Sequence, residues 1–281
     1  MAEQRENFMK PAISQVSTLS ASFERDIEDY AAAACHTVEL WLGKLETYLE
    51  KHSVDDARRL LADNEVTMPV ASFQGGLLVS QGEARRVHWE HFGRRLELCQ
   101  QLGIGTLVVA ADVHGPLTQQ DLDRLQVSLT QAGEQAGRHG VRLALEFQAS
   151  ATFLNNLQTA AAVVAETASP HVGLCLDVFH YYTGPSKEED FGYLTAANLF
   201  HVQLCDLVGI ARELAADADR ILPGDGDFHL RPLVERLHTI GYEGCVSVEL
   251  MNPQIWQIPP RQVAEVAMTA VRKLLGQATM G

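Results

Sequence analysis

The sequence has few basic residues compared with acidic ones. It holds 22 Lys and Arg against 36 Asp and Glu, which gives a formal net charge of −14 when His is neutral. No run of Lys or Arg is longer than a pair. A surface this negative repels phosphate backbones and anionic lipid surfaces. Nucleic acid and membranes are therefore not expected as partners.

Closely spaced cysteines are also missing. The chain has 5 cysteines, none in a CxxC pair, and three of them lie in apolar, strand-like runs. A reduced cysteine packs there as a small hydrophobic residue, which is typical of a reducing compartment rather than of a disulfide scaffold. The polar N-terminus shows no signal peptide, and no apolar run approaches the roughly 20 residues of a membrane-spanning helix. We expect a cytoplasmic protein.

The sequence does contain an alternation of short apolar runs and longer amphipathic stretches. Helical patterns cover about residues 83–102, 122–139, 157–167 and 261–275, and helix-ending glycines precede several of the apolar runs. The strand-like runs cover residues 11–17, 37–41, 68–73, 105–111, 141–147, 172–178, 199–205 and 244–250.

Strands that alternate with helices predict a parallel α/β fold, and this number of units in this length predicts a single (β/α)8 TIM barrel. We place the barrel domain at residues 11–281 and interpret residues 1–10 as a flexible N-terminal tail. The alternative is an open, doubly wound sheet. That fold usually carries a Gly-rich turn after its first strand, and "TLSASFERD" has no such turn.

Polar residues occupy the expected ends of the last four strands. These are Glu146, Asp177, Gln203 and Glu249, one from each strand. In a barrel these ends meet at the C-terminal face, where active sites lie. Carboxylates crowded on a half-buried rim raise one another's pKa, and a divalent cation relieves that conflict. Oxygen ligands favour Mg²⁺ or Mn²⁺, with Zn²⁺ or Co²⁺ as the alternatives.

Each of these residues also has a purely structural interpretation. A glutamate at a strand end is often solvated, and a single glutamine is often an ordinary polar strand residue. His201 shares a face with Gln203 and suits a core position as well as a metal site. Arg220 could contact a substrate or pair at the surface with Asp217 or Asp219. The coincidence over four successive strands is what favours a shared site.

The motifs LALEF, LCLDVFH, HVQLCD, DRILPGDGDFHL and YEGCVSVEL, in this order, resemble the xylose isomerase-like superfamily of sugar (phosphate) isomerases and epimerases. The resemblance runs from Pro11 onward and is most specific from Val141 to Leu250. It is strongest to inosose isomerase-like proteins of inositol catabolism, which share the DxFH and VSVEL patterns. Psicose and tagatose 3-epimerases, hydroxypyruvate isomerases and 3-dehydroshikimate dehydratases share the same frame.

The resemblance implies one divalent metal held by strands five to eight. Its ligands would be Glu146, Asp177, Gln203 and Glu249, with Gln203 standing where many members have His. It also implies that His180 and Arg220 contact substrate. Apurinic-site endonucleases share part of the motif set, but they need further zinc-binding histidines, and Ile221 stands at one of those positions.

Taken together, these residues predict a metal-dependent isomerase or epimerase acting on a keto-sugar or inosose. Glu146 and Glu249 would remove and return a proton through a metal-stabilised enediolate, while His180 holds a hydroxyl or moves a proton. Trp41 and Phe73 would line the substrate pocket. The alternatives are a dehydratase that uses the same site and a non-catalytic sugar-binding barrel. A small sugar or polyol is the expected partner, and a homo-oligomer is left open.

Overall fold

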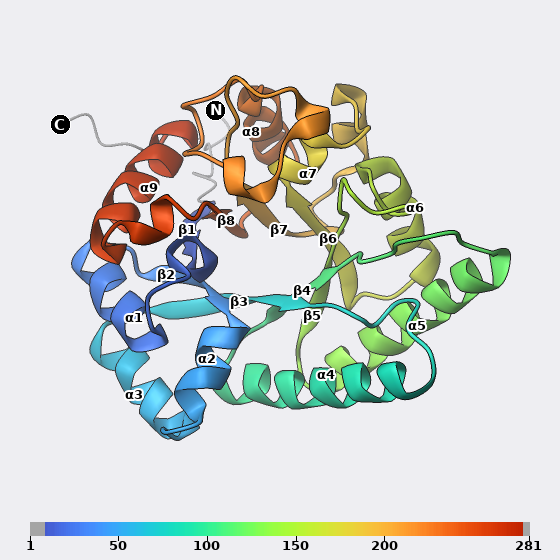
Figure 1. Ribbon diagram of the computed structural model, residues 1–281, viewed down its shortest axis with the longest axis horizontal. Coiled ribbons are helices and arrows are strands. Elements are labelled where there is room, and N and C mark those ends of the chain that lie inside the picture. Colours follow the sequence, from blue (N-terminus) through green and yellow to red (C-terminus); the bar gives the residue numbers. More distant parts are fainter. Residues whose placement is uncertain (1–8, 278–281) are drawn as a thin grey trace, which may run out of the picture.

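The computed structural model describes residues 9–277, which form a closed barrel of parallel strands (Figure 1). Each strand pairs with its neighbours in the sequence, and β8 closes the barrel against β1. The predicted TIM barrel is therefore confirmed. The strands are β1 (Lys10–Ser14), β2 (Thr37–Trp41), β3 (Thr67–Gln74), β4 (Thr106–Ala110), β5 (Arg142–Glu146), β6 (Val172–Asp177), β7 (Leu199–Leu204) and β8 (Cys245–Val248).

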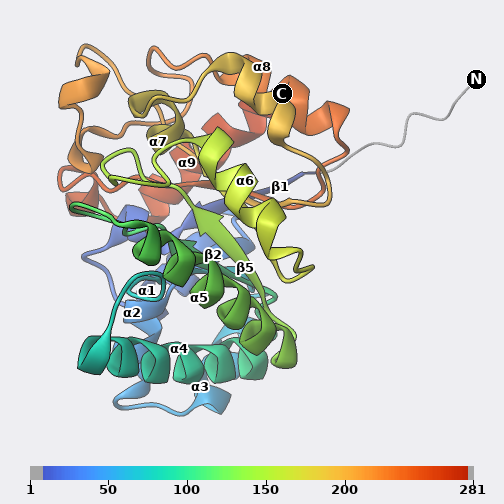
Figure 2. The same ribbon diagram turned by 90° about the vertical axis from the view of Figure 1, so that its right-hand side faces the viewer.

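Helices surround this barrel, and Figure 2 shows α5 and α6 on either side of β5. The helix predicted at residues 157–167 has the same bounds in the structure, and the other three predicted helices differ by one to three residues. The helices are α1 (Phe23–Ala32), α2 (Leu42–Leu49), α3 (Val54–Asp63), α4 (Gly82–Leu102), α5 (Gln119–Arg138), α6 (Leu157–Thr167), α7 (Val178–Thr183), α8 (Leu230–Thr239) and α9 (Pro260–Leu274).

The predicted N-terminal tail lies mostly outside the described residues. Within the described part, Met9 is buried and Lys10 already begins β1, one residue before the predicted domain start at Pro11. Within residues 9–277, no helix combines the length and the apolar character that crossing a bilayer requires.

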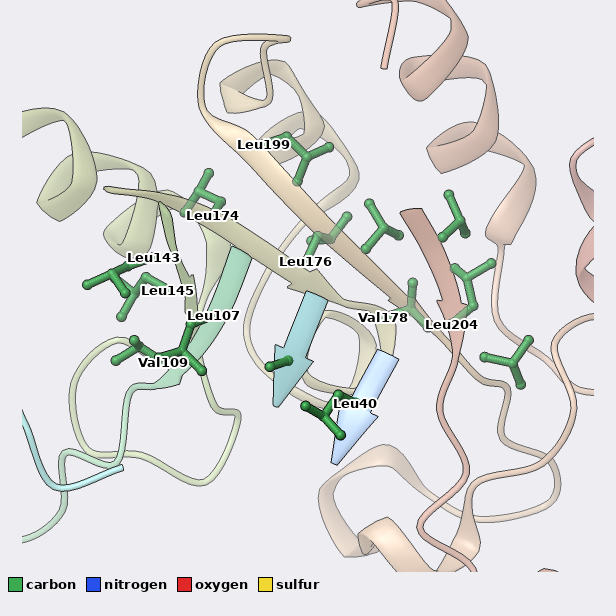
Figure 3. Close-up of a cluster of buried hydrophobic side chains, with 14 of the residues drawn as sticks. Leu40, Leu107, Val109, Leu143, Leu145, Leu174, Leu176, Val178, Leu199 and Leu204 are labelled. Carbon is green, nitrogen blue, oxygen red and sulfur yellow. The ribbon is translucent and has the colours of Figure 1, made fainter. Parts of the chain in front are cut away.

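Successive side chains on a strand point to opposite faces, so the strands contribute to two apolar layers, one outside and one inside the barrel. The outer layer fills the space between strands and helices, and Figure 3 shows leucines from neighbouring strands packed there, among them Leu143, Leu174 and Leu204. Each such fully buried side chain contributes roughly 1.5–3 kcal/mol. The inner layer is a separate cluster inside the barrel, formed by Ala12, Val70, Val108, Ala144, Cys175, Phe200 and Cys245.

The inner face becomes polar toward the C-terminal ends of the strands. Two residues beyond Ala144 on the same face lies Glu146, and two beyond Cys175 lies Asp177. The same step from Cys245 reaches Ser247 and then Glu249. The apolar cluster therefore forms a floor, and the polar ends of the strands stand above it. This change in composition places the site.

Candidate active site

The four predicted ligand positions converge at the C-terminal mouth of the barrel. Glu146 ends β5, Asp177 ends β6, Gln203 lies in β7 and Glu249 directly follows β8. Asp177 is also the N-cap of α7, and its Oδ1 accepts a hydrogen bond from the Phe179 amide at 2.8 Å. That bond fixes the carboxylate. Its other oxygen, Oδ2, lies 2.7 Å from Arg220 Nη2 and 3.6 Å from His180 Nε2.

Arg220 lies among these carboxylates rather than at the surface, since only 1% of the residue is exposed. Its Nη2 donates to Asp177 Oδ2 at 2.7 Å, and its Nη1 donates to Glu249 Oε2 at 3.0 Å. It also pairs with Asp217 and packs over the Phe179 ring at 4.4 Å. The alternative of a surface arginine is therefore wrong, although the pairing with Asp217 is present.

Gln203 is held by hydrogen bonds on both sides of its amide group. Its Nε2 donates to Glu249 Oε1 at 2.9 Å and to Glu39 Oε1 at 2.8 Å. Its carbonyl oxygen accepts from Cys175 Sγ at 3.1 Å. In this arrangement the amide nitrogen of Gln203 faces Glu249, whereas the predicted ligand atom, the oxygen, faces Cys175.

His180 stands on the first turn of α7, three residues after Asp177. Its Nε2 is 3.6 Å from Asp177 Oδ2, and its Nδ1 is buried without a hydrogen-bond partner. Ligand atoms of Glu146, Asp177 and His180 all lie within 4.8 Å of one another. Burial lowers the pKa of the His180 imidazole. A histidine in this state is neutral at pH 7, which is the form that binds metal ions.

Burial and mutual repulsion set the charge state of the carboxylates. Burial, and next the charge of Asp177, raise the pKa of Glu146 to about 8. Burial likewise raises the pKa of Glu249 well above its usual range, although the Arg220 charge acts in the opposite direction. One guanidinium thus leaves the group with an excess of negative charge that protons or another cation must balance.

A divalent cation fits these residues. The donor set combines carboxylate oxygens with a neutral imidazole, and ligands on opposite sides of one ion are separated by about 4.4 Å when each bond is about 2.2 Å. Two ligands of one ion lie no farther apart than this, and Asp177 Oδ2 and His180 Nε2 are 3.6 Å apart, while ligand atoms of Glu146, Asp177 and His180 all lie within 4.8 Å of one another. The unpartnered buried Nδ1 of His180 and the raised pKa of Glu146 are both features that a bound cation would explain.

The site opens into a small cavity of about 170 Å³. The predicted aromatic residues Trp41 and Phe73 both line it, with their ring centroids 5.3 Å apart. Typical pockets for drug-sized ligands measure roughly 300–1,000 Å³, so this cavity suits a smaller molecule. Wider cavities of about 470, 490 and 540 Å³ lie elsewhere on the described part of the chain, away from the four converging strand ends.

Sequence reasoning missed Glu39, which lies at the centre of the polar layer with 1% exposure. It accepts hydrogen bonds from His201 Nε2 at 3.0 Å, from Ser72 Oγ and from Gln203. Burial acts to raise the pKa of Glu39, but the His201 charge and these hydrogen bonds lower it overall. The sequence feature that could have indicated Glu39 is a single carboxylate inside the apolar run TVELW. His201 proves to be a supporting residue with full burial.

The loop after β7 is organised by Asp206, which is fully buried. Its two oxygens accept hydrogen bonds from the backbone amides of Leu207, Gly224 and Phe228 at 2.9 Å each. These bonds fold the Pro-Gly segment back onto β7 and hold Arg220, which precedes it, over the barrel mouth. Asp206 therefore has a structural role beside the site.

Comparison with known proteins agrees with this architecture. The model of a family described as "Xylose isomerase-like TIM barrel" matches residues 27–274. An inosose isomerase of Halalkalibacterium halodurans is 26% identical over 92% of this chain and 94% of its own. A 3-dehydroshikimate dehydratase of Pseudomonas putida is 26% identical over 91% of this chain but only 40% of its own length.

Among solved structures, the IOLI protein, described with a binding zinc atom, superposes with a TM-score of 0.89 at 22% sequence identity. The match covers 97% of this chain and 100% of that one. At this identity the likeness establishes the fold. Since the family model spans nearly the whole barrel, this chain belongs to the xylose isomerase-like TIM barrel family.

Proposed function

We propose that the protein is a metal-dependent isomerase or epimerase of a small keto-sugar or inosose. The observation that carries this is the cavity at the mouth of the barrel, which Glu146, Glu249 and Arg220 line, with Asp177 bound to Arg220 beside it. The 26% identity to an inosose isomerase over nearly the full length of both chains supports the substrate class.

Glu146, Asp177 and Glu249 would hold the cation, and the fourth position is open to Gln203, as the sequence predicts, or to His180. When bound, the cation would act as a Lewis acid on a substrate carbonyl and make the neighbouring C–H bond acidic. Glu146, with its pKa raised to about 8, can accept a proton and give it back near neutral pH.

The other residues of the mouth complete the proposed site. Glu249 would serve as the second proton-transfer group, since it reaches the same cavity from β8. Arg220 would orient substrate oxygens, and Trp41 with Phe73 would cover the apolar face of the sugar ring. His180, also on the cavity, would contact a substrate hydroxyl or move a proton, as the sequence predicts. A cytoplasmic location and a homo-oligomer stay predictions.

The experiment is a substrate screen in D₂O with the purified, metal-supplemented protein, followed by proton NMR. An inosose and several ketohexoses test for isomerisation, which exchanges the α-proton for deuterium and creates no vinyl signal. Changing Glu146 or Glu249 to Gln should lower turnover by at least about 10²-fold. Glu213→Gln, an exposed carboxylate on the loop after β7, is the matched control and should leave turnover unchanged. Full turnover in the Glu146 variant would refute its role.

A dehydratase is the second candidate, because the chain is equally similar, at 26% identity, to a 3-dehydroshikimate dehydratase. Proton removal by the same carboxylates would then be followed by loss of a β-hydroxyl as water. In the same NMR experiment 3-dehydroshikimate would give a new vinyl signal. The absence of both exchange and vinyl signals across the panel would favour a non-catalytic sugar-binding barrel.

A further inference from the structure

Asp112 is a carboxylate on the wall of the cavity that the proposed chemistry does not use. Val108 and Ala110 of β4, and then Asp112, all line the cavity, so every second residue along this segment faces it. Ala110 pairs with Glu146 across β4 and β5, and Asp112 lies two residues further along the chain. Asp112 therefore lies nearer the cavity entrance than Glu146 does.

Backbone contacts from neighbouring loops hold Asp112 in place. Its Oδ2 accepts a hydrogen bond from the Gly76 amide, in the loop after β3, at 2.6 Å. A Cβ added at Gly75 would lie 2.8 Å from the same oxygen, so a side chain at that position would displace the carboxylate. The next residue, Val113, is buried, and its carbonyl oxygen accepts a hydrogen bond from the Thr152 amide at 2.8 Å. A side chain fixed in this way is preorganised to contact a ligand.

No basic side chain balances the charge of Asp112. Within residues 9–277 its carboxylate forms no ion pair, and the one hydrogen bond that it accepts is at Oδ2. Among the described residues that line the cavity, Arg220 is the one Lys or Arg. It already pairs with the carboxylates of Asp177, Asp217 and Glu249. The described lining of the cavity therefore offers a substrate no unpaired Lys or Arg, whereas Asp112 offers it a hydrogen-bond acceptor.

We propose that Asp112 is a specificity-determining residue, which accepts hydrogen bonds from the hydroxyl groups of a neutral sugar and repels a carboxylate or phosphate at the same position. The inference rests on the proposed function, because it presumes a sugar in this cavity. A hydroxyl group and a carboxylate form a charge-assisted hydrogen bond, which is stronger than one between neutral groups. A substrate anion would meet the Asp112 charge in a partly desolvated cavity, where repulsion is stronger than in water. Asp112 therefore favours an isomerase of neutral sugars over a dehydratase of 3-dehydroshikimate, which carries a carboxylate.

The test separates this role from a purely structural one, in which Asp112 only accepts the Gly76 hydrogen bond. Asp112→Asn keeps an acceptor oxygen for that amide and removes the charge. The two probes are D-fructose and D-fructuronate, which has a carboxylate in place of one terminal CH₂OH group and nearly the same size. Exchange of the α-proton in D₂O gives kcat and KM for the full-length, metal-supplemented protein, and ligand-observed NMR gives the two Kd values without any need for turnover.

The wild type should prefer fructose to fructuronate by at least about tenfold in kcat/KM, and Asp112→Asn should reduce this preference by about tenfold. For fructose, the variant should raise KM at a nearly constant kcat, because the lost contact is made in the ground state and the transition state alike. A structural role alone would lower the activity toward both sugars together and would leave their ratio unchanged.

The matched control is Asp63→Asn, which removes the same charge from an exposed position at the end of α3 and should leave the preference unchanged. An unchanged preference in Asp112→Asn overturns the inference while the proposed function stands. If the wild type binds fructose but exchanges no proton of any sugar, the proposed function fails, and the ratio of the two Kd values decides the inference. If neither sugar binds the wild type, both fail. Equal kcat/KM values for the two sugars in the wild type would refute the inference even if Asp112→Asn did not fold.

Discussion

At the scale of single residues, burial changes the protonation state of Glu146 and thereby its ability to bind a cation and transfer a proton. Its pKa of about 8 means that roughly nine-tenths of these carboxyls carry a proton at pH 7 in the metal-free protein. A cation binds the carboxylate form, so binding must displace that proton. The same group can then donate or accept a proton during turnover without a large energetic cost.

We therefore predict that cation binding at pH 7 releases close to one proton from Glu146, with any proton on Glu249 added to it. Because the pKa is raised, apparent affinity should weaken about tenfold for each pH unit below 8. Calorimetry in buffers of different ionisation enthalpy measures the number of protons. Glu146→Gln should release about one proton fewer, and an equal release in both proteins would contradict this account.

The sequence could indicate Glu146, Asp177 and Glu249 because a carboxylate at the end of an apolar strand stands out by type and position. It could not indicate that Arg220 is buried between two of them, since burial of a loop residue depends on how the chain folds back. Nor could it show that Gln203 turns its nitrogen to Glu249, because that orientation is set by Glu39 on β2, 164 residues away.

At the scale of elements, the loop after β7 depends on a close approach between Gly226 and the Asp206 carboxylate. A Cβ added at Gly226 would lie 2.4 Å from both Asp206 Oδ1 and the carbonyl oxygen of Leu207. We predict that Gly226→Ala destabilises the protein by about 1–3 kcal/mol and lowers turnover, because Arg220 precedes this loop. Gly192→Ala, where a Cβ meets nothing within 4 Å, should change stability by less than about 0.5 kcal/mol. Urea unfolding of both variants checks this, and equal losses would refute it.

A second element-scale prediction concerns the packing of α1 and α2 against the segment after β1. Lys44 on α2 donates to Asp26 on α1 at 2.5 Å and to the Thr18 carbonyl at 2.7 Å. Burial nevertheless raises the pKa of Asp26 from 3.8 to about 6, with Lys44 acting in the opposite direction. A carboxyl with a raised pKa stabilises the fold fully below its unfolded pKa of 3.8, and the contribution is lost as pH rises through about 6.

The stability difference between the wild type and Asp26→Asn should therefore depend on pH. Asparagine mimics the neutral carboxyl and does not titrate. Between pH 4 and pH 7 the wild type should lose roughly 2.4 kcal/mol relative to the variant, since one pKa unit corresponds to about 1.4 kcal/mol and part of the contribution is already lost at pH 4. Denaturant unfolding at both pH values measures this. The unpaired Lys44 lowers the variant's stability by a nearly constant amount over this range, so a flat difference would contradict the prediction.

The elements themselves followed from the sequence to different degrees. The alternation of buried runs with Gly-ended helices located the eight strands, because a parallel barrel strand is apolar on both faces. Helical patterns with both bounds were predicted for four helices. α2, with 8 residues, and α7, with 6, are too short for an apolar period to stand out. Tertiary packing, rather than local pattern, determines such helices.

At the scale of the whole molecule, the barrel gathers more acidic than basic side chains at its C-terminal mouth. Acidic side chains from β2, β5, β6 and the residue after β8 share this interior with the Arg220 guanidinium and the His201 imidazole. The net charge of −14 adds a long-range field of the same sign. This field attracts metal cations to the protein and disfavours anionic substrates. A neutral sugar or polyol suits it better than a phosphorylated one.

Because the proposed cation site exists only in the folded barrel, metal binding should stabilise the native state by RT ln(1 + [L]/Kd). At a free metal concentration of 100 times Kd this is about 2.7 kcal/mol, which raises Tm by on the order of 5 °C for a protein of this size. A thermal scan of chelator-treated protein with and without Mn²⁺ measures the shift. Glu146→Gln combined with Glu249→Gln should abolish it, whereas Glu213→Gln should not. The metal-free double variant should melt close to the metal-free wild type at pH 7, since burial already raises the pKa of both carboxyls and glutamine mimics the neutral carboxyl. A double variant that melts well below the metal-free wild type would show that these carboxylates stabilise the fold without a cation. That result would contradict the proposal that a bound cation balances their charge.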